Sequence, residues 1–134
     1  MTPIPITLLS AAAAVALNIW LGARVVRSRR EHGVKIGDGG NDAVLRRMRA
    51  QANFLENTTL FLFLLGGIEL SGGNRLALGI VAAAFVLARI AHAIGMDGPQ
   101  LFRWRMVGMM TTVLAMVALS LWAIVCAAGA FLGR

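Results

Sequence analysis

The chain has 134 residues, of which 58% are hydrophobic and only 14% are charged. This composition argues against a water-soluble domain and predicts one unit, residues 1–134, built mostly from membrane-spanning helices. Its formal net charge of +7 comes from basic residues at the ends of apolar segments, so we expect a lipid membrane, and no nucleic acid, as partner. The single cysteine, Cys126, excludes an intramolecular disulfide.

Four apolar segments follow one another along the chain. Each is long enough to cross a hydrocarbon core of about 30 Å at a rise of about 1.5 Å per residue. The first segment has Pro3 and Pro5 at or before its first turn and no basic residue before it, which favours an uncleaved span over a signal peptide. We therefore expect an all-α integral membrane four-helix bundle with spans at 4–26, 43–70, 74–95 and 102–132.

The connections between these spans differ in charge. Arginines gather after the first span and between the third and fourth, whereas the connection after the second has only Arg75 and the N-terminus has no basic residue. Basic loops remain on the cytoplasmic side, so both termini should face away from the cytoplasm. Glycine and Asx residues at 37–41 predict a loop in the first of these connections.

The second span begins with polar residues. Arg49, Asn53 and Glu56 are spaced i, i+4 and i+7, so they line one helical face over two turns. Ionisable residues at membrane depth are costly to bury and usually face a partner helix or a wet cavity. This face is the leading candidate for a site. The amide of Asn18 in the first span is expected to bond a neighbouring helix or to contribute to a site.

The expected topology places polar residues of three spans at a similar depth, in one pocket on the cytoplasmic side. Its arginines outnumber its one carboxylate and favour a small polyanion, such as a guest with two carboxylates and one amine. Two alternatives remain open: a salt-bridge network of Arg49, Glu56 and Arg89, and a purely structural hydrogen bond from His92. The two histidines, one of them in a loop, have no metal-ligand spacing. The residues expected in the pocket are Arg49, Asn53, Glu56, Arg89, His92, Arg103 and Arg105.

Three short sequence segments that contain the pocket residues resemble one known family. Residues 49–56, RAQANFLE, are similar to the second-helix signature R-A-x-x-N-x-x-E of the MAPEG family, the membrane-associated proteins in eicosanoid and glutathione metabolism. Residues 88–92, ARIAH, and 101–105, LFRWR, are similar to the same family's third helix and the start of its fourth. The loop GDGG at 37–40 resembles that of its small bacterial inner-membrane members. The resemblance covers nearly the whole chain.

The resemblance implies a bacterial inner-membrane homotrimer that holds glutathione between subunits on the cytoplasmic side. It implies a glutathione transferase or peroxidase, in which an arginine stabilises the thiolate that attacks a lipophilic electrophile or hydroperoxide from the bilayer. Carried over by position, the arginine beside the thiolate is Arg105 or Arg103, with Arg105 favoured. The residues implied to hold glutathione are Arg49, Asn53, Glu56, Arg89 and His92, joined by Arg24 or Arg27 from the adjacent subunit.

The chain departs from the family pattern in two ways. It contains no tyrosine, and His92 and Met96 stand where many relatives have tyrosines near the third-helix arginine. Thr59 replaces the proline that often follows the glutamate of the second-helix signature, which predicts a straighter helix. A non-catalytic glutathione-binding or structural trimer is therefore the alternative. A small exporter is disfavoured because Glu56 lies among arginines near one end of its span.

Overall fold

The computed structural model describes residues 3–133, and these fold into four long helices. A short 3-10 helix, η1, precedes the last of them. The helices are α1 (Pro5–Glu31), α2 (Asp42–Leu70), α3 (Arg75–Gly95), η1 (Pro99–Leu101) and α4 (Phe102–Phe131). These bounds lie close to the predicted spans, except that α1 continues past residue 26 through the arginine-rich segment to Glu31. The predicted all-helical fold is thus confirmed.

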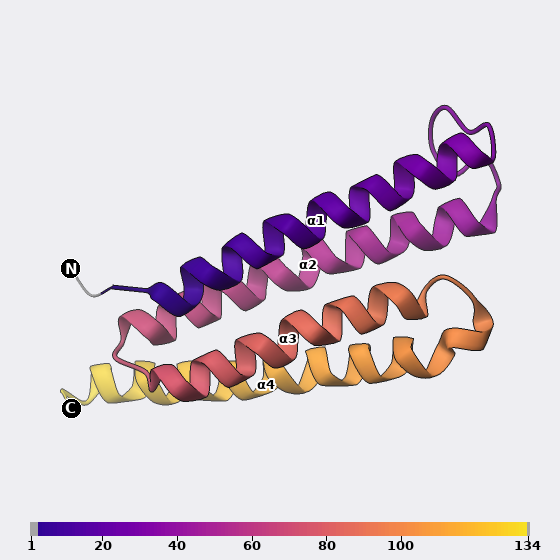
Figure 1. The fold of residues 1–134 in the computed structure, drawn as a ribbon. Helices are drawn as coiled ribbons and strands as arrows, with labels where there is room; N and C mark the ends of the chain where they lie inside the picture. The colour runs from indigo at the N-terminus through magenta and orange to yellow at the C-terminus, as the bar shows by residue number, and fades with distance from the viewer. Residues whose placement is uncertain (1–2, 134) are drawn as a thin grey trace.

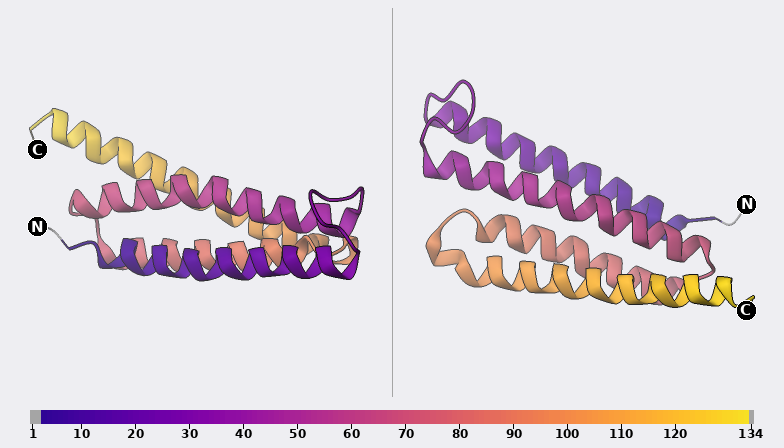
Figure 2. Two further views of the ribbon diagram at one scale, coloured as in Figure 1. Left: turned by 90° about the horizontal axis from the view of Figure 1, so that it is seen from above. Right: turned by 180° about the vertical axis from the view of Figure 1, so that it is seen from behind.

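The helices run up and down in two antiparallel pairs, α1 with α2 and α3 with α4 (Figure 1). The loop between α1 and α2 and the turn between α3 and α4 lie at one end of the bundle, here named the loop end. Both termini and the connection between α2 and α3 lie at the other, the terminal end. The two arginine-rich connections therefore share one end, as the charge pattern predicts. Towards its C-terminus, α4 diverges from the other helices (Figure 2).

Three helical stretches in the described part of the chain are long and apolar enough to cross a membrane: α1, α3 and Pro99–Phe131. The sequence predicts four, and α2 is the exception because charged residues interrupt its apolar character. At 29 residues, α2 is about 44 Å long at about 1.5 Å per residue, which exceeds a hydrocarbon core of about 30 Å. Length therefore permits α2 to span, and its crossing stays a prediction.

The larger of the two buried apolar clusters in the described residues lies between the helices in the terminal half of the bundle. The rings of Phe61 and Phe85 stack with centroids 3.8 Å apart, and Leu65, Leu78 and Leu119 are fully buried around them. This packing fixes α2, α3 and α4 relative to one another and leaves the polar residues of these helices nearer the loop end.

Two polar contacts tie α1 to α2. The carboxylate of Glu69, only 3% exposed, accepts hydrogen bonds from the backbone N–H groups of Ile6 (3.0 Å) and Thr7 (2.8 Å) and from the Thr7 hydroxyl (2.7 Å). It thereby satisfies donors of the first turn of α1, whose own N-cap residue supplies no side-chain bond. Nearer the loop end, Gln51 donates to the Asn18 side chain at 3.2 Å, which confirms the helix-bonding alternative for Asn18.

Two glycines bring α3 and α4 into backbone contact near the loop end. A Cβ added to Gly108 would overlap the backbone of Ala88 and His92, and one added to Gly95 would overlap the backbone of Arg105. Only glycine permits so close an approach. This crossing sets the rotation of α4 and thus decides which of its residues face α3.

Candidate functional site

A buried arginine lies where α2, α3 and α4 meet. The side chain of Arg89 on α3, which is 3% exposed, donates to the amide oxygen of Asn53 on α2 at 2.9 Å. It also contacts the hydroxyl of Thr112 on α4 and the Nδ1 of His92, each at 3.5 Å. The Thr112 hydroxyl in turn donates to the carbonyl of Gly108 at 2.8 Å, which leaves its lone pairs directed towards Arg89. One guanidinium thus joins three helices.

The positive charge of Arg89 has no carboxylate partner within residues 3–133. Its hydrogen-bond partners are neutral, its Nε is buried without any partner, and its guanidinium lies 6.0 Å from the ring centre of Phe54. A buried charge with no counter-charge costs several kcal/mol. The site is therefore electrostatically suited to an anion that the chain itself does not supply.

Only part of the single predicted pocket is assembled in one chain. Asn53, Arg89 and His92 come together as predicted, but Arg49 and Glu56 are exposed on the outer face of α2. No ion pair joins Arg49, Glu56 or Arg89 in the described part of the chain, so the salt-bridge alternative is not observed. The reason is rotation, since Arg49 and Glu56 lie on the side of Asn53 that faces away from α3 and α4.

A cavity of about 460 Å³ opens at the loop end, above the Arg89 cluster. One residue of α2, the end of α3, the turn that follows it and the start of α4 line this cavity. Arg105 is the only one of the predicted site residues among its lining residues, which are Arg46, Gly95, Met96, Gly98, Pro99, Phe102 and Arg105. No acidic residue lines this cavity, so its electrostatic character is positive.

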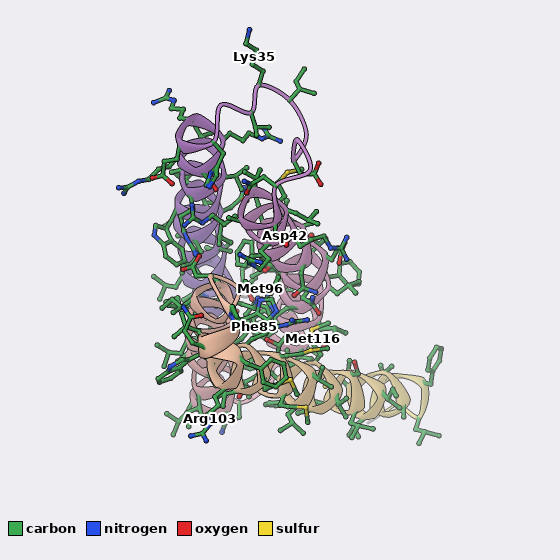
Figure 3. The ribbon with its side chains drawn as sticks, turned by 90° about the vertical axis from the view of Figure 1, so that its right-hand side faces the viewer. Lys35, Asp42, Phe85, Met96, Arg103 and Met116 are labelled. Atoms are coloured by element: carbon green, nitrogen blue, oxygen red, sulfur yellow. The ribbon has the colours of Figure 1, made fainter. Side chains whose placement is uncertain are left out.

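The structure places the two candidate arginines of α4 differently. Both side chains are exposed, but Arg105 lines the cavity and Arg103 does not. In the view onto the loop end, Arg103 lies at the edge of the bundle opposite the start of α2 at Asp42, and Met96, which lines the cavity, lies between them (Figure 3). Of the two residues, Arg105 is the one in position to meet a ligand there.

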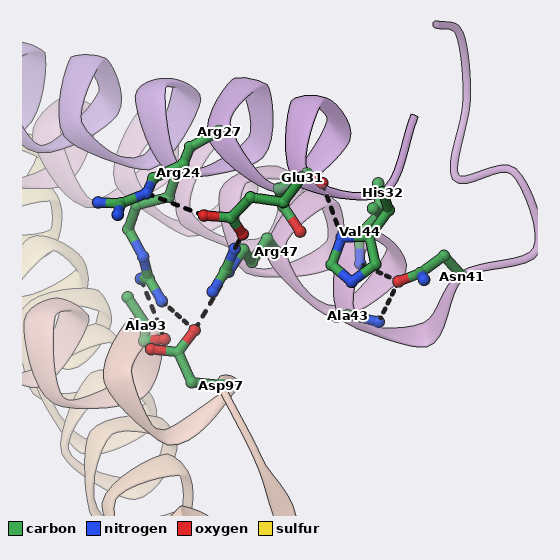
Figure 4. A network of polar contacts seen from close by, with 11 residues as sticks. Arg24, Arg27, Glu31, His32, Asn41, Ala43, Val44, Arg47, Ala93 and Asp97 are labelled. Atoms are coloured by element: carbon green, nitrogen blue, oxygen red, sulfur yellow. Dashed lines mark hydrogen bonds and ion pairs between the residues drawn. The ribbon is translucent and has the colours of Figure 1, made fainter. Parts of the chain in front are cut away.

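The two arginines of α1 that are candidate site residues, Arg24 and Arg27, form ion pairs with acids of the same chain (Figure 4). Arg24 forms an ion pair with Asp97 and also donates to the carbonyl of Ala93 at 3.2 Å. Arg27 pairs with Glu31 at 3.0 Å. Arg47 of α2 lies between the two acids, 3.4 Å from Asp97 and 3.8 Å from Glu31. This network ties α1 and α2 to the turn after α3.

Four residues with clear roles escape the sequence reasoning. Thr112 gives no signal because a hydroxyl in an apolar helix most often bonds its own backbone. Asp97 and Glu69 bind residues far away in the sequence, which no local pattern reveals. Arg46 does have a signal: it precedes Asn53 by seven residues, which places both on one helical face.

Comparison with known proteins now adds to this geometry. The MAPEG family profile matches residues 7–125, most of the chain. The chain belongs to the MAPEG family. It is 32% identical over 101 residues to the inner membrane protein YecN of Escherichia coli K12, a match that covers 73% of this chain and 76% of YecN. The YecN protein of Escherichia coli O6:H1 matches to the same extent.

Family membership confirms the resemblance carried by the motifs of the second, third and fourth helices. With its three apolar helical stretches and its inner-membrane relatives, the chain is an integral inner membrane protein. In this MAPEG protein, the family signature at residues 49–56 contributes one residue, Asn53, to the buried cluster and displays two, Arg49 and Glu56, on the outside of the chain.

Proposed function

We propose that this MAPEG protein is a membrane-bound glutathione-dependent transferase or peroxidase. The observation that carries the proposal is the buried Arg89 guanidinium, which contacts Asn53, His92 and Thr112 but no carboxylate within residues 3–133. An anionic ligand would supply the missing counter-charge. Arginine suits this task because it keeps its charge when buried and presents a planar fork that matches a carboxylate.

Glutathione fits the groups available in the chain. It has two carboxylates, one ammonium group and one thiol. Arg49 and Arg89 suit the carboxylates, and Glu56, which has no ion-pair partner in the described residues, suits the ammonium group. Arg105 in the cavity would stabilise the thiolate and so lower the pKa of the thiol, which increases the fraction of nucleophile at neutral pH.

The thiolate would then act on a lipophilic substrate from the bilayer. In the transferase reaction, sulfur forms a bond to an electrophilic carbon, and either a halide leaves or the carbanion takes a proton from water. In the peroxidase reaction, sulfur attacks the terminal oxygen of a hydroperoxide, the O–O bond breaks, and the alkoxide takes a proton. A second glutathione reduces the resulting sulfenic acid, which yields glutathione disulfide and water.

We further propose that the active unit is a homotrimer with the loop end towards the cytoplasm. Arg49 and Glu56 are exposed on α2, on a helix flanked by apolar helices of membrane-spanning length. Lipid would leave these charges without partners, whereas a second subunit and a bound ligand would cover them. In this arrangement Arg24 and Arg27 lie at the loop end of α1, the end from which an adjacent subunit would reach the ligand.

Calorimetry with glutathione tests this proposal directly. The detergent-solubilised protein should release or take up heat with glutathione and gain thermal stability, because a ligand that binds only the folded state raises its stability. Arg49→Ala and Glu56→Gln should weaken both signals. If the wild type shows neither heat nor thermal stabilisation at millimolar glutathione, the glutathione proposal is wrong.

The absence of tyrosine favours one second candidate, a glutathione-binding or structural trimer without turnover. The groups around Arg89 are an amide, an imidazole and a threonine hydroxyl, so no phenol is available to support a thiolate. Binding without conjugation of a chlorinated nitroaromatic, and without reduction of a lipid hydroperoxide, would select this candidate. For an enzyme, Arg105→Ala should lower turnover more than it lowers binding.

A further inference from the structure

Two helices present the same arrangement of polar residues around Arg89. On α2, Arg46 precedes Asn53 by seven residues, and on α4, Arg105 precedes Thr112 by seven. Asn53 and Thr112 both accept from Arg89, while Arg46 and Arg105 both line the loop-end cavity. Seven residues make two turns, or about 10.5 Å along a helix. The cavity therefore lies about two turns nearer the loop end than the Arg89 cluster, along the same helical faces.

The side chain of Arg46 lacks the partners that its neighbours have. Its Nε atom is buried and makes no hydrogen bond, and no ion pair involving Arg46 occurs among residues 3–133. Asp97 belongs to the same turn as the cavity, between Met96 and Gly98, but it does not line the cavity and instead binds Arg24 and Arg47. Asp42, four residues before Arg46 on α2, forms no ion pair with it either, which leaves an unpartnered donor beside an acid-free cavity.

We propose that Arg46 is a further ligand-binding residue, which adds a carboxylate site to this cavity beside Arg105 and about two turns from Arg89. Arg46 lies outside the family signature at residues 49–56. An extended tripeptide spans about 10 Å at about 3.5 Å per residue, which matches the two-turn separation of the two levels. The identity of the ligand as glutathione rests on the proposed function, but the carboxylate site itself rests on Arg46, Arg105 and the cavity.

The test compares ligands with and without carboxylates on the full-length, detergent-solubilised protein. Wild type, Arg46→Gln and Arg46→Lys are titrated by calorimetry with glutathione, with glutathione diethyl ester and with glutarate. Arg103→Gln is the matched control, since it removes an exposed arginine two residues from Arg105 that does not line the cavity. Circular dichroism and the ligand-free Tm establish that each variant is folded.

We expect Arg46→Gln to weaken glutathione and glutarate binding by about tenfold, as for the loss of one charge-assisted hydrogen bond, and to leave diester binding unchanged. Arg46→Lys should recover part of the loss because it keeps the charge, and it also serves if Arg46→Gln does not fold. Arg103→Gln should bind all three ligands as the wild type does. Equal losses for glutathione and its diester, or no loss for either, would overturn the role of Arg46.

The outcomes separate this inference from the proposed function. If glutathione binds wild type and Arg46→Gln equally well, the proposed function stands and the inference fails. If glutathione does not bind but glutarate does, in a manner that depends on Arg46, the inference stands and the glutathione proposal fails. If neither ligand binds the wild type, both are wrong.

Discussion

Replacing Arg89 by methionine should separate ligand binding from the stability of the bundle. In the ligand-free protein the guanidinium is 3% exposed, lacks a carboxylate partner within the described residues, and has one buried N–H group without an acceptor. Methionine removes the buried charge and fills irregular space well. The variant Arg89→Met should therefore be more stable without ligand and unable to hold an anion.

The expected magnitude follows from the contacts of Arg89. Its one hydrogen bond of normal length, to Asn53 at 2.9 Å, contributes about 1.5–3 kcal/mol, and its other two contacts at 3.5 Å contribute little. Burying the charge costs several kcal/mol. The difference favours Arg89→Met by about 1–3 kcal/mol in the free energy of unfolding. For a chain of this length, each kcal/mol raises Tm by about 4 °C.

Thermal unfolding followed by circular dichroism, with and without glutathione, measures both effects. Arg89→Met should show a higher ligand-free Tm and no shift with glutathione. Arg89→Lys is the control: it keeps the charge but not the planar fork, so its ligand-free Tm should not rise. A ligand-free destabilisation of Arg89→Met by more than about 2 kcal/mol would mean that the guanidinium holds the helices together, and the reasoning would be refuted.

Three further predictions concern the scaffold around the site. Glu69→Gln should lower the free energy of unfolding by about 1–3 kcal/mol, because it removes the charge and at least one of the three hydrogen bonds. Thr7→Val loses only a hydroxyl and should lower the free energy of unfolding by about 1 kcal/mol. Similar Tm values for Glu69→Gln and the wild type would contradict this prediction. Asp97→Asn should change stability by less than about 1 kcal/mol because its ion pairs are partly solvated, and chemical denaturation in low and high salt checks this. Gly108→Ala should lower the free energy of unfolding by about 1–3 kcal/mol and weaken glutathione binding, because the added methyl group separates α3 from α4. Gly67→Ala is the control, since a Cβ at Gly67 meets open space. It should change neither the Tm nor the binding measured by calorimetry.

The helices themselves could be predicted from sequence because their signals are local. Apolar runs of membrane-spanning length set the number of helices, and Asn41 and Asn74 cap the starts of α2 and α3 with their side chains. The glycine-rich stretch at 37–41 forms a loop as predicted, with Gly37, Gly39 and Gly40 at positive φ. The crossing of the membrane by α2 stays a prediction, because its charged residues exclude it from the helices apolar enough to span.

The site could be predicted only as far as helix direction determines it. An up-and-down bundle places the start of α2 beside the end of α3, so the approach of Asn53 to Arg89 follows from topology. Helix rotation is different, because residues two apart on a helix point about 200° apart. Whether Arg103 or Arg105 faces inward depends on the backbone contact at Gly95 and Gly108, which the sequence does not reveal.

The distribution of acids explains why an anion site remains in this chain. Of its six acidic residues, Glu31 and Asp97 neutralise arginines at the loop end, and Glu69 caps α1 at the terminal end. Asp38 accepts from a backbone N–H within the loop, and Asp42 lies in the first turn of α2. None of these five pairs with an arginine that faces the cavity or the buried cluster.

The sixth acid, Glu56, lies on the outer face of α2 and completes this distribution. Among residues 3–133, Arg46, Arg89 and Arg105 are thus left without carboxylates along a path of about two helical turns, while Arg24, Arg27 and Arg47 at the same end are paired. With six acids and thirteen bases, some basic residues must lack an acidic partner. At the surface an unpaired arginine costs little, because water solvates its charge. In this chain Arg89 is buried and Arg46 has a buried Nε, so two of the unpaired arginines lie where an uncompensated charge is costly. A bound anion is the simplest way to compensate these charges.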